Sequence, residues 1–159
     1  MEIALAQKED LNAVNELRRT VQMLHAQSRP DIFRSDFGSQ LENYLKEVFE
    51  NKTADLIVAK IDQTVVGFMM GSLVHHGQSP YTNERTYYRV QELGVKPGFQ
   101  RQGIGRAMLL FLQDSLKAQT SVNGVRKIEL DVWDFNRDAM AFYEEMGFHF
   151  NRHYLELDL

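Results

Sequence analysis

Hydrophobic residues recur along this chain with two different periods, and the change of period divides its first part into a strand and two helices. Alternation over residues 2–6 predicts a short strand. Spacing of three and four residues then predicts a helix that is broken at Ser28–Asp31, and a second helix starts at Ser39, which matches a capping box with Glu42. The apolar stripe of the first helix consists of Leu11, Val14, Leu17, Val21 and Leu24.

The rest of the chain alternates between strands and helices. The expected ranges are strands 55–61, 64–74 and 87–95, helix 103–119, strand 127–133, helix 136–146 and strand 148–157. Asp62 and Gln63 form a hairpin turn, and 75–84 is an exposed loop. The order βααβββαβαβ is typical of an α/β or α+β fold with a mixed sheet covered by helices. No repeat or linker divides residues 1–159, so we expect a single domain.

Composition excludes several classes of protein. The chain has no Cys, which rules out a disulfide scaffold, a cysteine zinc site and a thiol nucleophile. Its net charge of -4 argues against a protein that holds nucleic acid by charge alone. No apolar run approaches the ~20 residues of a membrane helix, and the first ten residues do not resemble a signal peptide. We therefore expect a cytoplasmic protein with neither a nucleic-acid nor a membrane partner.

The segment Val95–Arg106 carries the strongest chemical signal. Pro97 and Gly98 turn the chain after a strand, and Gly103 and Gly105 open a helix whose first half is apolar. Backbone N–H groups at the start of a helix are unpaired and carry partial positive charge, so they bind phosphate oxygens. A tight turn in which glycine merely permits close packing would give the same pattern, and the residues alone leave both interpretations open.

Two familiar nucleotide-binding motifs do not match this turn. A Walker A loop ends in Gly-Lys-Ser/Thr, whereas Gly105 is followed by Arg106 and Ala107. A dinucleotide fingerprint needs a third glycine where the chain has Met108. A protein that binds ATP or NAD is therefore poorly supported, although Arg101 would add positive charge for some other phosphate ligand.

The strand before the turn changes phase. Tyr88 and Val90 follow one alternation. Leu93 and Val95 follow the other, which predicts a β-bulge near Gln91–Glu92. Bulges leave backbone N–H groups unpaired and re-aim side chains beside active sites. Glu92 is thus either a carboxylate close to the glycine turn or an exposed charge on a strand.

The helix expected at 136–146 has a structural explanation for each residue taken singly. Asn136 is a suitable N-cap, and Gly147 is a suitable stop. Phe142 and Tyr143 share a face, so Tyr143 is by default a core tyrosine.

Taken together, the two segments resemble the GNAT superfamily of N-acetyltransferases. Residues 100–105, Gln-Arg-Gln-Gly-Ile-Gly, resemble its acyl-CoA pyrophosphate loop, Gln/Arg-x-x-Gly-x-Gly/Ala. Residues 136–148 resemble its later helix motif, Asn-x-x-Ala-x-x-Phe-Tyr-x-x-x-Gly-Phe. The order of the expected elements extends the likeness over nearly the whole chain.

The resemblance implies a mainly antiparallel sheet of six to seven strands flanked by about four helices. The sheet would splay between strands 87–95 and 127–133, with acetyl-CoA in the opening. Backbone near Leu93 and Val95 would pair with the pantetheine arm, and the glycine turn would hold the pyrophosphate. The residues implied to bind acetyl-CoA are Leu93, Val95, Gln100, Arg101, Gln102, Gly103, Ile104, Gly105, Arg106 and Asn136.

The resemblance also implies transfer of an acetyl group from acetyl-CoA to a primary amine by direct attack, without a metal. An alkyl amine with a pKa near ~10 is mostly protonated at neutral pH, so a base must remove its proton. Glu92 is the expected base, and Tyr143 is implied to protonate the leaving thiolate. The alternative is a non-catalytic acyl-CoA-binding or sensing domain on the same fold.

The acceptor stays open between a small amine, a peptide N-terminus and a lysine. We expect it among the first two helices, the 29–37 link and the 75–84 loop. Carboxylates there that could attract a cationic amine are Asp31, Asp36 and Glu84. The candidate metal ligands His25, His75 and His76 lack a matching carboxylate spacing, so no metal is expected. Homodimers are common in the family, but the residues do not reveal an interface.

Overall fold

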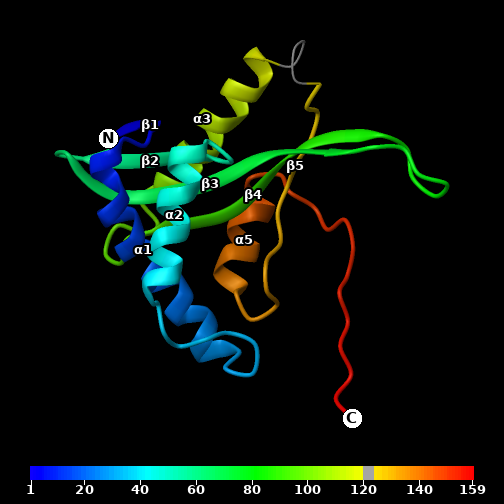
Figure 1. Cartoon of the computed structure of the whole chain (residues 1–159), viewed down its shortest axis with the longest axis horizontal. Coiled ribbons are helices and arrows are strands. Elements are labelled where there is room, and N and C mark those ends of the chain that lie inside the picture. The colour runs from blue at the N-terminus through cyan, green and yellow to red at the C-terminus, as the bar shows by residue number, and fades with distance from the viewer. Residues whose placement is uncertain (120–123) are drawn as a thin grey trace.

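A computed structural model describes residues 1–119 and 124–159 of the chain. Its strands form one sheet in the order β1-β2-β3-β4-β5 (Figure 1). The strands are β1 (Glu2–Leu5), β2 (Asp55–Ile61), β3 (Thr64–His76), β4 (Arg85–Val95) and β5 (Ile128–Glu129). The pairs β1–β2, β2–β3 and β3–β4 are antiparallel, and β5 runs parallel to β4. The mixed, mainly antiparallel sheet is as expected, but the described residues form five strands in place of the predicted six to seven.

The helices match the sequence prediction more closely. They are η1 (Lys8–Asp10), α1 (Leu11–Ser28), α2 (Ser39–Asn51), α3 (Ile104–Ala118) and α5 (Arg137–Glu145). The capping box expected for α2 is wrong, because Gly38 is the N-cap and no side chain caps this helix. Glu42 instead accepts a hydrogen bond of 3.0 Å from the Arg19 guanidinium of α1.

Hydrophobic side chains are buried on both faces of the sheet. Along β2, Leu56 and Val58 join the cluster of α1 and α2, whereas Ile57 and Ala59 join the cluster of α3. Successive strand residues point to opposite faces, so a strand covered on both faces is apolar throughout. The sheet thus lies between α1 and α2 on one side and α3 on the other.

Two local features of the sheet follow from the sequence as predicted. Asp62 and Gln63 both have positive φ (48° and 63°) in the turn between β2 and β3. On β4, Glu92 pairs with Met70 and Val90 pairs with Gly71, so Gln91 is the extra residue of a bulge. The predicted bulge is confirmed, and it lies where β4 leaves β5.

The prediction of a strand at 148–157 is wrong. These residues have no ladder partner, and the chain runs from α5 away from the sheet to its end (Figure 1). The strand expected at 127–133 is also cut to the two residues of β5. A strand exists only where a neighbour supplies hydrogen bonds, and among the described residues no strand pairs with residues 130–133 or 148–157. Alternation in the sequence indicated the strand but not a partner for it.

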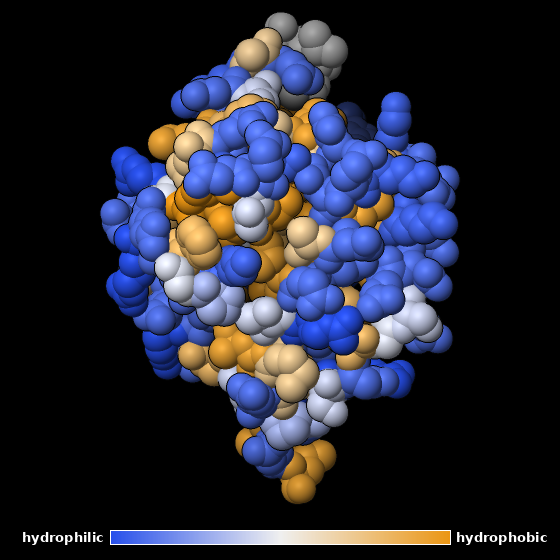
Figure 2. All heavy atoms as spheres, turned by 90° about the vertical axis from the view of Figure 1, so that its left-hand side faces the viewer, coloured by the Kyte–Doolittle hydropathy of each residue, from blue (hydrophilic) through white to orange (hydrophobic). Residues whose placement is uncertain are grey.

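Figure 2 views the molecule from the left-hand side of Figure 1, where β1 and the start of α1 lie. Hydrophobic surface on this face gathers in a central band bordered by hydrophilic side chains. Among the described helices, none combines the length and the apolar character needed to cross a bilayer.

Candidate active site

The turn into α3 has an unusual backbone. Gly98, Arg101 and Gly103 have positive φ values of 86°, 57° and 80°. Gly103 is the N-cap of α3, and a Cβ built on it or on Gly98 would meet no atom within 4 Å. The glycines therefore serve the backbone conformation and leave space outside the turn. The first N–H groups of α3 lack helical partners and lie beside this space.

Gly105 serves a different purpose. A Cβ on Gly105 would lie 3.1 Å from Cζ of Phe142 on α5. Close packing therefore explains this glycine. The contact between Gly105 and Phe142 joins the two segments that carry the family resemblance. Ile104, which is 2% exposed, anchors the same turn in the core. Its side chain can position the backbone but cannot reach a ligand.

The polar side chains of the turn are exposed. Gln102 donates a hydrogen bond of 3.0 Å to the carbonyl of Gly98, and Gln100 donates one of 3.4 Å to the carbonyl of Val95. Arg101 lies 3.0 Å from a carboxylate oxygen of Asp138. Arg106 likewise lies 4.0 Å from Glu145 and is exposed. Both arginines could turn towards an anion, because exposed ion pairs of this kind are weak.

β4 and β5 separate immediately after they meet. Their pairing covers Tyr88 with Ile128 and Arg89 with Glu129. Beyond Arg89, β4 continues for six residues, to Val95, bonded to β3 alone among the described strands. The open edge includes Leu93 and leads to the glycine turn, so the predicted splay is present.

The carboxylate of Glu92 is held by Arg18. Arg18 donates from Nε and Nη2 to the two carboxylate oxygens at 2.9 and 3.0 Å. The Arg18 side chain is 4% exposed, and its Nη1 donates to the carbonyl of Leu41 at 2.8 Å. Glu92 thus faces α1 and α2 rather than lying free on a strand edge.

Tyr143 lies in a well-defined helix end. Gly147 has a φ of 88°, and the N–H of Phe148 donates to the Tyr143 carbonyl at 2.9 Å. The N–H of Gly147 donates to the Glu144 carbonyl at 2.9 Å, which completes a Schellman motif. The Phe148 ring meets the Tyr143 ring edge-on at 5.5 Å. Burial raises the pKa of Tyr143 to about 12.

Asn136 is the predicted N-cap of α5. Its side-chain oxygen accepts a hydrogen bond of 3.2 Å from the Ala139 N–H. The two N–H donors of the amide group are not used by this cap, so they could serve a ligand in the opening.

Sequence reasoning missed an aromatic cluster that joins the end of α1 to the segment that follows β5. The Phe33 ring lies 4.9 Å from His25 and 5.1 Å from Trp133, and Phe135 lies 5.6 Å from His25. These rings join the end of α1, the link before α2 and the segment before α5. In the sequence, these four aromatic residues stand among polar residues, which could have indicated a functional surface. Their spacing in the chain does not show that their rings are in contact.

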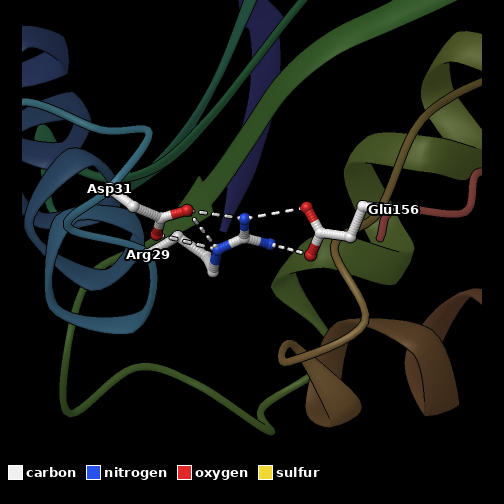
Figure 3. Close-up of polar contacts among 3 residues, drawn as sticks. All are labelled: Arg29, Asp31 and Glu156. Atoms are coloured by element: carbon white, nitrogen blue, oxygen red, sulfur yellow. Dashed lines mark hydrogen bonds and ion pairs between the residues drawn. The ribbon is translucent and has the colours of Figure 1, made fainter. Parts of the chain in front are cut away.

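Arg29 extends this cluster with charge. Its guanidinium lies 5.8 Å from the centre of the Trp133 ring and binds both Asp31 and Glu156 (Figure 3). The Asp31 carboxylate is thus already paired, and Arg29 lowers its pKa through side-chain hydrogen bonds. The same holds for Asp36, whose pKa is lowered by hydrogen bonds from Arg34.

Arg18 was also missed. It interrupts the apolar stripe of α1 one residue after Leu17, and a charge in such a stripe is a signal of a buried ion pair. Gly94 is small because of close packing, since a Cβ there would lie 2.7 Å from Phe68 and 2.9 Å from Val21.

The three candidate metal ligands do not converge. His25 packs in the aromatic cluster, whereas His75 lies 3.0 Å from Thr86 and His76 stacks on Tyr87. Within residues 1–119 and 124–159, no group of three His, Cys, Asp or Glu side chains could hold a metal ion.

Known proteins resemble this chain in sequence and fold. A sequence model of the acetyltransferase (GNAT) family matches residues 20–148. A thialysine N-epsilon-acetyltransferase of Caenorhabditis elegans is 23% identical over 80% of this chain and 74% of its own length. The ribosomal protein bS18-alanine N-acetyltransferase of Escherichia coli is 43% identical over 35% of each chain.

Solved structures agree with this result. A point mutant of the BH1408 protein from Bacillus halodurans has a TM-score of 0.92 and 28% identity over 100% of this chain and 99% of its own. The aminoglycoside N-acetyltransferase AAC(6')-Iy, solved with CoA, has a TM-score of 0.71 over 99% and 98%, at 14% identity. The matched family model, which spans both sequence segments and the splayed strands, shows that this chain belongs to the acetyltransferase (GNAT) family and is an N-acetyltransferase.

Proposed function

We propose that this enzyme transfers an acetyl group from acetyl-CoA to a primary amine in a ternary complex. The observation that carries the proposal is the open edge of β4, which continues beyond β5 and ends at the exposed turn of Gly103. The family's members use acetyl-CoA, and the related AAC(6')-Iy was solved with CoA. A purely sensing role is not favoured by any feature of the structure.

The residues present fit acetyl-CoA. Extended backbone at Leu93 and Val95 offers hydrogen bonds to an amide-containing arm. The space outside Gly103, the unpaired N–H groups of Gln102 to Arg106, and the nearby side chains of Gln100 and Arg101 suit a pyrophosphate. Asn136 keeps two donors for the arm. When bound, acetyl-CoA supplies the acetyl group as a reactive thioester.

Glu92 is the proposed general base. A carboxylate has about four lone-pair positions, and Arg18 occupies one on each oxygen. The remaining positions can accept a proton from the ammonium form of the acceptor, directly or through water. The guanidinium of Arg18 keeps the carboxylate in one orientation while it does so.

Tyr143 is the proposed general acid. Because its pKa is raised to about 12, the phenol keeps its proton throughout the neutral range and can donate it to a thiolate. The nitrogen of the ammonium form loses two protons in all. Glu92 takes the first and releases it to solvent, and the second, lost after the C–N bond forms and as the C–S bond breaks, replaces the proton that Tyr143 gives to the leaving sulfur. The backbone N–H groups at the β4 bulge are suitable donors to a developing negative oxygen.

The acceptor is proposed to enter on the side of α1, the 29–37 link and the aromatic cluster. Small amines, peptide N-termini and lysine side chains all carry the required amine. The names of the relatives include both thialysine, acetylated at N-epsilon, and an alanine of ribosomal protein bS18. A cytoplasmic location belongs to this proposal as an expectation from the sequence.

Calorimetric titration with acetyl-CoA tests the cofactor site most directly. Gly103→Asp and Gly103→Asn are a matched pair, because both side chains tolerate positive φ and only Asp adds a negative charge beside the proposed pyrophosphate. We expect the Asp variant to bind at least about tenfold more weakly than the Asn variant. Equal affinities, or no binding by the unmodified enzyme, would contradict the proposed site. Turnover of an amine panel then identifies the acceptor.

A further inference from the structure

The guanidinium of Arg29 lies between two carboxylates that hold it in different ways (Figure 3). Asp31, two residues further along the chain, accepts from Nε at 2.9 Å and from Nη2 at 2.7 Å. Glu156, near the end of the chain, accepts from Nη1 at 2.8 Å and from Nη2 at 3.0 Å. Asp31 therefore fixes the orientation of the guanidinium from within the 29–37 link, whereas the Nη1–Nη2 edge binds a carboxylate from outside that link.

The Nη1–Nη2 edge of Arg29 is a two-point carboxylate site. A guanidinium and a carboxylate form two parallel hydrogen bonds, so the pair recognises the carboxylate by shape as well as by charge. The guanidinium also lies over the Trp133 ring, 5.8 Å from its centre, and the Arg29 side chain is only 25% exposed. A group that is oriented in advance loses little freedom when a ligand binds. Arg29 is thus prepared to bind a carboxylate, whichever molecule supplies it.

Glu156 is a weakly held occupant of this edge. Its side chain is 63% exposed. Its neighbours Leu155 and Leu157 are 87% and 84% exposed, so they do not pack Glu156 into place. Ion pairs that involve exposed side chains contribute little to stability. A carboxylate of another molecule can therefore displace Glu156 easily, because the exchange leaves the charge at Arg29 unchanged.

The site belongs to the elements at which the acceptor is proposed to enter. Arg29 is the C-cap of α1, and Arg18 of the same helix holds the proposed base Glu92. A rise of ~1.5 Å per residue places the Cα atoms of the two arginines about 16 Å apart along the helix. About four or five extended residues, at ~3.3–3.6 Å each, span that length, and the long side chains shorten the distance to be bridged. One acceptor can therefore reach Glu92 with its amine and Arg29 with a carboxylate.

We propose that Arg29 is a specificity-determining residue that binds a carboxylate of the acceptor, so that the enzyme acts on amines that also carry a carboxylate. Glu156 occupies the Nη1–Nη2 edge and is displaced when the acceptor binds. Free amino acids and peptides share this chemistry and differ in the distance between amine and carboxylate. The inference rests on the proposed acetyl transfer, because it names the acceptor of that reaction, whereas carboxylate binding by Arg29 can be tested without turnover.

Trp133 provides a direct binding test, because it is the only tryptophan of the chain and lies beside Arg29. Its fluorescence is followed during titration with alanine and with linear alanine peptides of up to five residues, each prepared as the C-terminal carboxylate and as the carboxamide. For at least one length, we expect the carboxylate form to bind at least about tenfold more tightly, since hydrogen bonds between charged groups are the stronger ones. Equal binding of both forms at every length, or tighter binding of the carboxamides, would overturn the proposal.

Three substitutions separate the partners of Arg29. Arg29→Gln should abolish the preference for the carboxylate form. Glu156→Gln should strengthen binding of that form by about two- to fivefold, because an exposed competitor is removed. Arg34→Gln is the matched control, since Arg34 holds Asp36 through two hydrogen bonds in the same link, and the preference should remain. Loss of the preference in Arg34→Gln, or no strengthening in Glu156→Gln, would contradict the assignment.

Acetylation of the same compounds tests the acceptor role. With acetyl-CoA present, the carboxylate form that binds best should have a higher kcat/KM than its carboxamide, and Arg29→Gln should reduce this advantage at least about tenfold. Equal kcat/KM for both forms, or no acetylation of any carboxylate form while Trp133 reports its binding, would overturn the acceptor role. Failure of the enzyme to bind acetyl-CoA would instead contradict the proposed function, and it would not affect the Trp133 titration.

Discussion

The two sides of the opening between β4 and β5 are built differently. The side at the start of α3 is held by buried contacts, such as Ile104 in the core and the close approach of Gly105 to Phe142. The side at the α1–α2 link is held by aromatic rings and by exposed pairs such as Arg29 with Asp31. The difference indicates that the proposed acetyl-CoA side is a fixed frame. The proposed acceptor side can vary in sequence with little effect on stability.

The largest expected effect is on turnover at the junction of the two sides. Tyr143→Phe keeps the packing against Phe148 but removes the proposed proton donor. General acid catalysis contributes about 10²–10⁴-fold, so we expect kcat to fall within that range. The affinity for acetyl-CoA, measured by calorimetry, should not change. Tyr88→Phe, at a buried tyrosine bonded to Asp55, is the control, and a similar loss of kcat there would remove the special role of Tyr143.

The ionisation of Tyr143 gives a second prediction, which concerns the pH dependence of stability. Its pKa is raised to about 12 by burial, whereas an exposed tyrosine ionises near ~10. The folded state therefore keeps the phenol protonated where the unfolded state begins to lose its proton. This contribution to stability is complete below about pH 10 and is lost as pH rises towards about 12. A difference absorbance titration against Tyr143→Phe should show the extra ionisation near the higher value, and one near ~10 would refute the burial argument.

The next effect is on stability at the acceptor side of β4. Arg18→Met leaves the Glu92 carboxylate without its buried partner. Breaking a fully buried pair costs about 3–5 kcal/mol, and we expect the lower end of this range because the Glu92 side chain is 27% exposed. Chemical unfolding measures the loss. The double variant Arg18→Met/Glu92→Leu should recover part of it, because no charge is then left unpaired. If the double variant is less stable than Arg18→Met, the pair is not the source of the cost.

A smaller loss of stability is expected at the frame. Gly105→Val places side-chain atoms against Phe142, and overpacking of this kind costs about 1–3 kcal/mol. Chemical unfolding of Gly105→Val/Phe142→Leu should show partial recovery, because the smaller side chain makes room. Additive losses in the double variant would mean that the two residues do not compete for space.

The smallest effect on stability is expected at the acceptor link. Asp31→Asn removes an exposed charge, so the melting temperature and the acetyl-CoA affinity should stay unchanged. We expect the KM for the amine to rise, because the variant lies beside the aromatic cluster. Asp36→Asn is the matched control, since Asp36 forms the same kind of pair with Arg34 in the same link. An equal rise of KM in both variants would mean that the loss of one negative charge causes the change, whichever of the two carboxylates is removed.

Much of the fold could be predicted because its signals are local. The helices of the described chain, the turn at Asp62–Gln63 and the bulge at Gln91 each follow from residues within a few positions of one another. The glycine turn was recognised for the same reason. The environment of Glu92 was not, because Arg18 is 74 residues away in the chain. The aromatic cluster was missed because its rings come from three separate segments.

The sequence by itself determined the helices, the backbone conformation of the turn into α3 and the residues of the two family motifs. A helix satisfies its own hydrogen bonds within four residues, and a glycine at positive φ needs no distant partner. Only the tertiary structure decided that Glu92 is paired, that Gly105 is small to admit Phe142, and that residues 148–157 have no place in their own sheet. A strand and an ion pair both need a partner from elsewhere in the chain, and periodicity carries no information about where that partner lies.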